Sequence, residues 1–495
     1  MRNRVLSLFF SAMFSTGPIF CTETTSEEGS PDLRLAEPVD AVVADLDSYI
    51  SQFMDQEAIP GVAIALLRDS RIVWSAGYGV TNTLTREPVI SETLFEVASN
   101  SKVMTAYIAL RLVDAGELSL DTPLNHYLKD PWLPPSLYRD VITLRQVLSH
   151  SSGLGHNSLS RENLFAPGRG YSYSGMGYLY LQHVIEAITG RDLEEVAQEH
   201  LFVPLGMHSS SYVNEDSELT SRTAGGHLTA VVPSLFFVVL YLAALLVVAL
   251  VGFPVLRIWT GRWTPTRPIM LGAAITALVV SMTPPFVGLR WLGLSEFAWA
   301  IALSGLALFA SLGLLLIVGR SAANWLLPAR KRTRVAVQIA WGLLAVIGLS
   351  FLVIKTRNLP MPRWTPVPSG AASSVRATVG DMATFLVEIS NPRFLNEETG
   401  RQLRTSQVQL SEDLSWGLGP GIQHSRQGDA LWQWGQHLDF QSVMIIYPDS
   451  GLGVVVLTNS DLFNPDVAIR IAHRAIGGPI EPILRASHTE FDYRE

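Results

Sequence analysis

Cysteine is almost absent from this 495-residue chain, and charged residues are few. The one cysteine, Cys21, excludes an internal disulfide framework and a cysteine-rich metal site. The net charge of -8 offers no broad basic surface to a nucleic acid. No HExxH, CxxC, Walker or Rossmann pattern occurs, so the sequence implies no metal, nucleotide or other cofactor.

Apolar residues, by contrast, are abundant. They make up 48% of the chain against 16% for charged residues, and the mean hydropathy is +0.25. These values are high for an ordinary soluble protein, so part of the chain is expected to lie in a membrane.

The N-terminus has the pattern of a secretory signal peptide. Its first residues, MRNRVLSLFFSAMF, place two arginines before a short apolar run. We assign residues 1–25 to this signal, which would export the chain that follows. Cys21 also raises the alternative of a lipid-anchored form, although bulky Phe20 stands where such sites usually carry a small residue.

Four runs of about 20 residues carry almost no charge, which is the length that a bilayer core of about 30 Å requires. They cover residues 235–256, 269–289, 297–318 and 335–354. The first and third connections between them hold three and five basic residues, and the middle one holds a single arginine. Because basic connections stay in the cytoplasm, the sequence predicts a multi-pass protein of the cell membrane whose flanking chain is extracytoplasmic, on the periplasmic side. Buried core helices of a large soluble protein are the alternative.

The chain on both sides of these runs has the pattern of a folded α/β domain. Periodicity predicts helices over 39–56, 144–150 and 466–476, and another that begins at Thr378. Short apolar runs bounded by turn residues predict two strands within 60–78 and three or more after residue 415. Strands at both ends indicate one domain, formed by residues 36–230 and 363–480, whose sheet is closed across an insertion at 231–362.

Ser99 and Lys102 form an S-x-x-K pattern at the start of an apolar run with helical periodicity. Residues three apart share one face of a helix, so the hydroxyl and the amine point into the same space. A serine hydroxyl is a poor nucleophile unless a base beside it takes its proton. The helix N-terminus adds partial positive charge where an acyl oxygen would become negative. For this pattern alone, solvated Ser and Lys side chains in a first helical turn are the alternative.

Several further motifs occur in order along the chain: PGVAIALL, TLFEVASNSKVMTAYIALRLVDAGELSLDTPL, LRQVLSHSSGL, YSYSGMGYLYLQHVIEAITG and YPDSGLGVVVLTNSD. Together they closely resemble the serine β-lactamase-like hydrolases, the superfamily of class C β-lactamases, D-alanyl-D-alanine carboxypeptidases, D-aminopeptidases and related esterases. The resemblance covers about residues 40–230 and 365–475. It implies an α/β (α+β) serine β-lactamase/DD-peptidase-like fold, with an antiparallel sheet flanked by helices and a helical subdomain, here interrupted by the four transmembrane helices.

The resemblance makes Ser99 the nucleophile and Lys102 the neighbour that receives or steers its proton. Tyr173 matches the tyrosine of the family's Y-x-N motif, whose phenolate acts as general base. A tyrosine pKa near 10 suits this role only if adjacent cations such as Lys102 lower it. Because Tyr171 and Tyr178 lie close by in the sequence, a core or turn tyrosine is the alternative.

Two positions depart from the family pattern. Gly175 replaces the asparagine of Y-x-N, so the amide that usually bonds the lysine or a substrate carbonyl is missing. Gln433 replaces the basic residue of the family's K-T-G or H-x-G strand motif, although another register would put Trp434 there. Gly435 keeps the glycine of that motif, which would let a substrate backbone approach the strand closely.

The remaining site candidates follow from the same strand motif. The N–H of Gln436 would join that of Ser99 in an oxyanion hole. His437 is a candidate for the missing proton donor unless it is simply solvated, and His150 matches a motif that we take to be structural. A Lys or His at position 433 would pair with a substrate carboxylate, so Gln433 favours neutral amides or esters. The candidates for substrate binding are therefore Gly175, Gln433, Gly435, Gln436 and His437.

The sequence thus predicts a membrane-anchored extracytoplasmic serine hydrolase. It would form an acyl-enzyme with an amide or ester, such as a peptidoglycan-type peptide, a β-lactam or a small ester. Its partners would be that small-molecule or peptide substrate and the lipid bilayer, with no nucleic acid. The alternative is a catalytically weakened, penicillin-binding-like sensor that recognises cell-wall peptides without turnover. A transport role for the membrane block is disfavoured because its four runs carry no acidic or basic residue.

Overall fold

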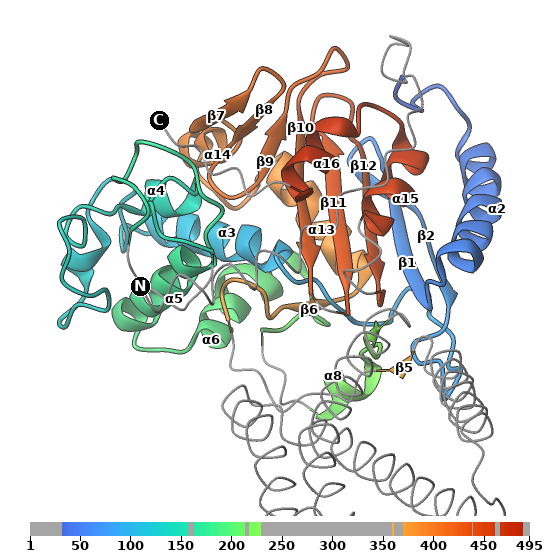
Figure 1. Ribbon diagram of the computed structural model, residues 1–495, viewed down its shortest axis with the longest axis horizontal. Helices are drawn as coiled ribbons and strands as arrows, with labels where there is room; N and C mark the ends of the chain where they lie inside the picture. Colours follow the sequence, from blue (N-terminus) through green and yellow to red (C-terminus); the bar gives the residue numbers. More distant parts are fainter. Residues whose placement is uncertain are drawn as a thin grey trace, which may run out of the picture.

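The computed structural model describes residues 32–156, 163–212, 217–228, 359–360, 370–437, 439–460 and 466–488. In this part of the chain an antiparallel sheet has the strand order β2-β1-β12-β11-β10-β9-β8-β7 (Figure 1). Its eight strands are β1 (Gly61–Arg68), β2 (Arg71–Gly79), β7 (Val408–Ser411), β8 (Leu414–Trp416), β9 (Gly421–Gln423), β10 (Ala430–Gln436), β11 (Gln441–Tyr447) and β12 (Leu452–Thr458).

Strands from the two ends of the chain meet in the middle of this sheet. β1 pairs with β12 in a register that places Val62 opposite Thr458 and Leu67 opposite Gly453. Every residue of β11 and of β12 is buried, because these strands are covered on both faces. This arrangement confirms the prediction that one sheet is closed by distant segments.

Helices lie on both faces of the sheet (Figure 1). α2 (Val39–Glu57), α15 (Val467–Ile476) and α16 (Glu481–His488) pack on one face. α3 (Asn100–Asp114) and α13 (Val379–Ser390) pack on the other. The two apolar layers that result are separate, so the sheet carries a core on each side.

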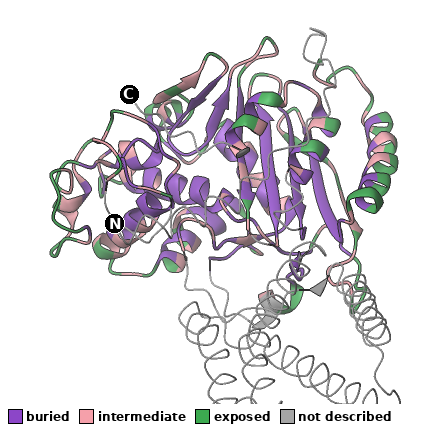
Figure 2. Cartoon of the chain, in the orientation of Figure 1, coloured by how far each residue is buried: buried purple, intermediate pink, exposed green. Residues whose placement is uncertain are grey.

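The helices α2 and α3, which lie on opposite faces of the sheet, differ in how their residues are buried. In α2 the buried residues Val42, Leu46, Ile50 and Phe53 recur every three or four positions, as in an amphipathic surface helix. In α3, twelve of the 15 residues are buried. A helix that is buried nearly all round lies inside a domain, and Figure 2 shows α3 as buried ribbon between the sheet and a second group of helices.

This second group forms the helical subdomain that the family resemblance implies. It comprises α4 (Leu144–Leu148), α5 (Gly175–Thr189), α6 (Leu193–Ala197), a π-helical turn (Gln198–Phe202) and α7 (Val203–Leu205). The remaining elements are β3 (Phe95–Glu96) paired with β6 (Arg376–Ala377), β4 (His227–Leu228) paired with β5 (Leu359–Pro360), a 3-10 turn (Leu124–Tyr127), α8 (Ser217–Arg222) and α14 (Glu397–Leu403).

The prediction of four transmembrane helices is corrected by the structure. Among the described residues, no helix is both long enough and apolar enough to cross a bilayer. The longest of them, α2, has 19 residues but is amphipathic and carries five acidic side chains. The runs at 235–256, 269–289, 297–318 and 335–354, like the signal assigned to 1–25, lie outside the described residues. The prediction rested on hydropathy and on the basic residues of the connections. Neither a multi-pass membrane protein nor a location at the cell membrane is supported by the described residues.

Candidate active site

The turn between β3 and α3 presents Ser99. Ala98, just before it, has a left-handed backbone with a φ of 47°, which costs a non-glycine residue about 1 kcal/mol or more. Ser99 then occupies the N-cap position of α3, yet its hydroxyl makes no capping hydrogen bond to the helix. Serine is favoured at this position because it usually caps. Here the hydroxyl is left available for other contacts.

Side chains from distant segments hold the first turn of α3 in place. The Asn100 amide donates to Ser442 Oγ at 2.8 Å, and Ser442 Oγ donates to Val97 O at 2.8 Å. The hydroxyl of Ser101 accepts the backbone N–H of Val375 at 3.0 Å. These bonds join the helix start to β11 and to the segment that leads into β6. The position of Ser99 is therefore fixed by contacts with Ser442 and Val375, which the sequence motifs did not identify.

Lys102 lies one turn along α3, on the same side as Ser99. Its Nζ donates to Ala372 O at 2.9 Å and lies 3.0 Å from Ser99 Oγ. The side chain is only 2% exposed, and no carboxylate among the described residues pairs with it. Burial lowers the pKa of Lys102 to about 7, because the charged ammonium loses its hydration. Much of the amine is therefore unprotonated at neutral pH.

Tyr173 reaches the same point from the loop before α5. Its phenol is hydrogen-bonded to Ser99 and accepts from Gln433 Nε2 at 3.0 Å. Lys102 Nζ lies 4.9 Å from the centre of the ring. Burial raises the pKa of Tyr173 far above its ordinary value, and the two hydrogen bonds offset this only in part. The sequence led us to expect a lowered pKa, and the structure gives the opposite direction because desolvation dominates.

Aromatic rings surround Tyr173. Its ring lies 5.2 Å from that of Trp434 and 4.4 Å from that of His150, measured between centroids. His150 is fully buried, which lowers its pKa well below the ordinary value, and its Nδ1 accepts the backbone N–H of Ser174 at 2.9 Å. His150 therefore supports the loop that carries Tyr173. His156, whose ring lies 5.6 Å from that of Tyr173, is a neighbour that no sequence motif marked.

Gly175 is a position of close approach between two segments. It is the first residue of α5, after the N-cap Ser174. A Cβ at position 175 would lie 2.9 Å from the backbone oxygen of His156. The chain at 156 therefore fills the space in which the side chain of the family's asparagine would begin. The structure places Gly175 beside Tyr173 and gives a packing reason for the missing amide.

β10 passes next to Ser99 at Gly435. A Cβ at this glycine would lie 2.2 Å from Val97 O and 3.1 Å from Ser99 N, so a larger residue would push the strand away. The backbone N–H of Ser99 donates no hydrogen bond to another described residue. It is therefore available to an acyl oxygen. A contribution from the N–H of Gln436 stays a prediction.

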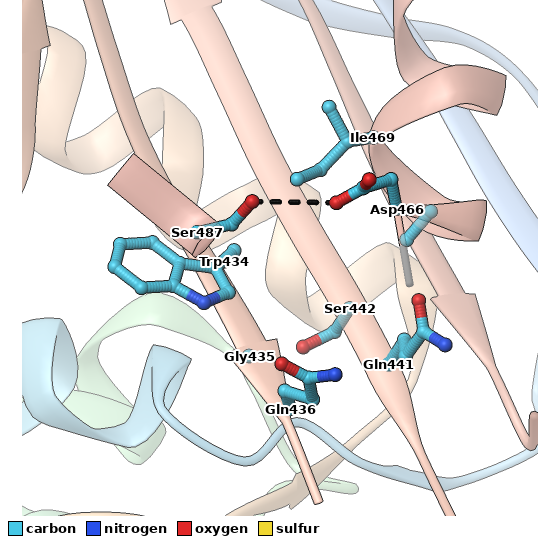
Figure 3. A pocket seen from close by; sticks show the side chains of 9 residues that line it. Trp434, Gly435, Gln436, Gln441, Ser442, Asp466, Ile469 and Ser487 are labelled. Carbon is cyan, nitrogen blue, oxygen red and sulfur yellow. Dashed lines mark hydrogen bonds between the residues drawn. The ribbon is translucent and has the colours of Figure 1, made fainter. Parts of the chain in front are cut away.

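Among the described residues, no hydrogen bond joins the side chain of Gln436 to Ser99, Lys102 or Tyr173. This side chain borders a cavity on the side of the sheet that α15 and α16 cover, together with Trp434, Gln441 and Asp466 (Figure 3). Trp434 thus lies between the cavity and Tyr173, since its ring also stacks on the tyrosine. The candidate at Gln436 for the reaction centre is therefore its backbone N–H and not its side chain.

His437 follows β10 and bonds to Glu96 with Nδ1 3.0 Å from Oε2. Glu96 also accepts from Arg376 Nη2 at 3.2 Å. Burial alone would raise the pKa of Glu96, but His437 and Arg376 outweigh it and lower that pKa. The described contacts of His437 therefore lead to an ion-pair network and not to Ser99. They tie the end of β10 to β3, the strand just before the nucleophile turn.

The structure thus brings Ser99, Lys102, Tyr173 and Gln433 together. Gly435 packs beside the Ser99 turn, and Gly175 follows the loop that carries Tyr173. Among the described residues, no group of three or more His, Cys, Asp or Glu side chains is arranged to hold a metal ion. What the centre provides is a hydroxyl, a partly unprotonated amine and an oriented phenol in hydrogen-bond contact. This is the chemistry of acyl transfer by an activated serine.

Comparisons with known proteins point to the same chemistry. A family model described as Beta-lactamase matches residues 46–237 and 325–478. Penicillin-binding protein 4 of Amycolatopsis lactamdurans is 31% identical over 188 residues, which cover 34% of this chain and 49% of that protein. Esterase EstB of Burkholderia gladioli is 28% identical over 212 residues, covering 36% of this chain and 53% of that protein.

Solved structures share the fold. D-alanine carboxypeptidase AmpC from Burkholderia cenocepacia aligns over 88% of this chain and 99% of its own, with a TM-score of 0.55 and 16% identity. An octameric penicillin-binding protein homologue from Pyrococcus abyssi aligns over 88% of this chain and 76% of its own, with a TM-score of 0.56 and 17% identity.

The match to the curated relatives spans about half of their length. The family model, in contrast, covers more than half of this chain. It confirms the family that the motifs indicated and, with it, the expected class of serine hydrolases. The chain belongs to the Beta-lactamase family.

Proposed function

We propose that this protein is a serine hydrolase that forms an acyl-enzyme at Ser99 with an amide or ester substrate. The observation that carries the proposal is the buried amine of Lys102, which lies 3.0 Å from the Ser99 hydroxyl and has a pKa lowered to about 7. A hydroxyl beside an unprotonated amine is an activated nucleophile. The penicillin-binding protein and the esterase among its relatives support the same reaction type.

Lys102 is the general base of this proposal. Its free amine takes the Ser99 proton while Oγ bonds to the substrate carbonyl carbon. The ammonium returns that proton to the leaving nitrogen or oxygen when the bond between the carbonyl carbon and the leaving atom breaks. The products are an acyl ester of Ser99 and a neutral amine or alcohol. Water then cleaves the ester and releases the acid.

The oxygen that becomes negative in this step needs hydrogen-bond donors. The N–H of Ser99 is unoccupied among the described residues and faces β10 at Gly435. The N-terminus of α3 adds partial positive charge at the same place. We assign the second donor to the backbone of Gln436, at the end of the strand that Gly435 brings close.

The substrate class follows from the charges around the centre. Gln433 is neutral, Arg376 is engaged by Glu96, and Lys102 is partly unprotonated at neutral pH. None of these three side chains therefore offers a free permanent cation to a substrate carboxylate. Of the candidate classes, which are peptidoglycan-type peptides, β-lactams and small esters, this arrangement favours an ester or amide that is uncharged near the scissile bond.

A fluorophosphonate probe and a fluorescent penicillin test the proposal on the purified full chain. We expect covalent labelling of the wild type that Ser99→Ala abolishes. Ser48→Ala, which removes an exposed hydroxyl from α2, is the matched control and should label like the wild type. Equal labelling of Ser99→Ala would overturn the proposal. Reversible binding of the penicillin without an adduct in the intact mass would favour the sensor instead.

A further inference from the structure

One edge of β10 is uncovered where the strand passes the nucleophile. Among the described strands, β9 pairs with this edge only over residues 430–432. The turn after β10 begins with the N–H of His437 donating to Phe440 O at 2.9 Å. Because hydrogen-bonded and non-hydrogen-bonded pairs alternate along an antiparallel ladder, the next pair, Gln436 opposite Gln441, is not hydrogen-bonded. The N–H of Gln436 therefore points away from β11, toward the uncovered edge.

The segment that leads into α3 runs along this edge. A Cβ at Gly435 would lie 3.1 Å from the backbone nitrogen of Ser99, so the two backbones approach each other closely there. Further along the chain, His437 Nδ1 lies 3.0 Å from Oε2 of Glu96. Gln436 lies between these two points of contact. The contacts on either side of it therefore determine how its N–H is spaced from the N–H of Ser99.

The contact between His437 and Glu96 has a defined donor. Burial raises the pKa of Glu96, but the hydrogen bond and charge of His437, together with Arg376, outweigh burial and lower that pKa. The carboxylate is therefore ionised at neutral pH and can only accept, so Nδ1 of His437 carries the hydrogen. Arg376 Nη2, from the strand paired with β3, donates to the other carboxylate oxygen at 3.2 Å. Because both of its oxygens are held, Glu96 is a fixed anchor for His437.

A second contact joins the same two segments. Phe95 precedes Glu96 in β3, and Phe440 closes the turn that begins at His437. Both phenylalanines are buried, and their rings meet edge to face with 6.5 Å between centroids. This apolar contact remains when the side chain of His437 is removed. We therefore expect such a change to alter the spacing at Gln436 without unfolding the domain.

We propose that Glu96 and His437 form a clasp that positions the N–H of Gln436 beside that of Ser99, so that both N–H groups bind the oxygen that becomes negative in the reaction. The inference rests on the proposed function and deepens it. Glu96 and His437 are positioning residues, since the clasp acts through the backbone that it holds. Donors held in place beforehand stabilise the negative oxygen more strongly, because nothing has to reorganise when the charge appears.

Two substitutions at position 437 test the clasp. His437→Leu removes the donor to Glu96, whereas His437→Asn keeps one, because its amide nitrogen lies near the place of Nδ1. The full chain is labelled with a fluorophosphonate at several concentrations, which separates the affinity for the probe from the maximal rate of adduct formation at Ser99. The phosphoryl oxygen of this probe takes the place of the substrate's carbonyl oxygen.

Removing one donor of an oxyanion hole lowers the rate by about 100-fold to 1,000-fold. For a displaced donor, we expect His437→Leu to lower the maximal rate by about tenfold or more and to leave the affinity for the probe unchanged. His437→Asn should stay near the wild-type rate. A role in stability alone would change urea unfolding and leave the maximal rate of the folded protein as it is.

His424→Leu is the matched control. His424 lies in the turn before β10, at the opposite end of the strand from Gly435, and its Nδ1 lies 2.9 Å from Asp429 Oδ1. Its side chain is 31% exposed, close to the 28% of His437. The variant thus also removes a histidine–carboxylate pair next to β10, and it should label at the wild-type maximal rate.

A wild-type maximal rate in folded His437→Leu would overturn the inference. An equal loss in His424→Leu, or no recovery in His437→Asn, would overturn it too, because the effect would then not come from this hydrogen bond. If His437→Leu does not fold, His437→Ala removes the same donor without adding an apolar side chain, and the same loss is expected. Wild-type protein that shows no adduct at Ser99 at any probe concentration would instead contradict the proposed function itself.

Discussion

Replacing Lys102 with methionine should stabilise the protein in a way that depends on pH. The lysine is buried with a pKa lowered from 10.5 to about 7. Between these two values the unfolded chain binds a proton that the folded chain does not, so the stability of the wild type rises with pH in this window. Methionine has a similar length and no charge, and it removes this dependence.

The expected magnitude follows from the pKa shift. Each unit corresponds to about 1.4 kcal/mol, so burial of the lysine costs on the order of 5 kcal/mol at pH 6 and about 2 kcal/mol at pH 9. The lost hydrogen bonds to Ser99 and Ala372 subtract about 1 kcal/mol each at either pH. Lys102→Met should therefore be more stable than the wild type by about 2–3 kcal/mol at pH 6 and nearly equal to it at pH 9.

Urea unfolding followed by tryptophan fluorescence at pH 6 and pH 9 measures this difference. The change between the two pH values, about 2.5 kcal/mol, does not depend on the hydrogen bonds that the variant loses. Labelling at Ser99 should be lost in the same variant, because the base is gone. A difference in stability that is the same at both pH values would refute the assignment of a depressed pKa to Lys102.

Three further substitutions test the geometry. Gly435→Ala puts a Cβ 2.2 Å from a backbone oxygen. It should destabilise the fold by about 2 kcal/mol or more and slow labelling at least tenfold. Gly380→Ala is the control, because its Cβ would meet nothing nearer than 3.8 Å, and it should behave like the wild type in both assays. Gly175→Asn restores the family motif but places a Cβ 2.9 Å from a backbone oxygen, so urea unfolding should show a loss of about 1–2 kcal/mol, and faster labelling with unchanged stability would contradict this. Tyr173→Phe removes the phenol hydroxyl beside the nucleophile and should lower the labelling rate by roughly 100-fold or more with little change in stability; a rate near that of the wild type would show that the phenol takes no part.

The sequence predicts those parts of the site that local geometry determines. Ser99 and Lys102 meet because residues three apart share a helix face, and this holds in almost any context. The sheet that joins strands from both ends of the chain was also predictable, because alternating apolar runs at both ends need a common sheet. In each case the pattern and the contact that it predicts are close in sequence or follow from burial alone.

The rest depends on contacts between distant segments, which the sequence does not reveal. Tyr173 and Gln433 are 260 positions apart, and His437 and Glu96 are 341 apart. The sequence indicated that a cation would lower the tyrosine pKa, but the sign depends on how deeply the phenol is buried. Gly175 looked like a lost functional group, and only the position of His156 shows that the space is filled. The membrane prediction used hydropathy, which reports composition and not structure.

The central claim is that Lys102, with a pKa near 7, activates Ser99. The most direct test is the rate at which a fluorophosphonate labels the wild-type chain between pH 5 and pH 10, with the modified residue located by peptide mapping. We predict one adduct, on Ser99, formed at a rate that rises about tenfold per pH unit up to about pH 7 and is constant above it. A rate that keeps rising to pH 10, or an adduct on another residue, would contradict the account.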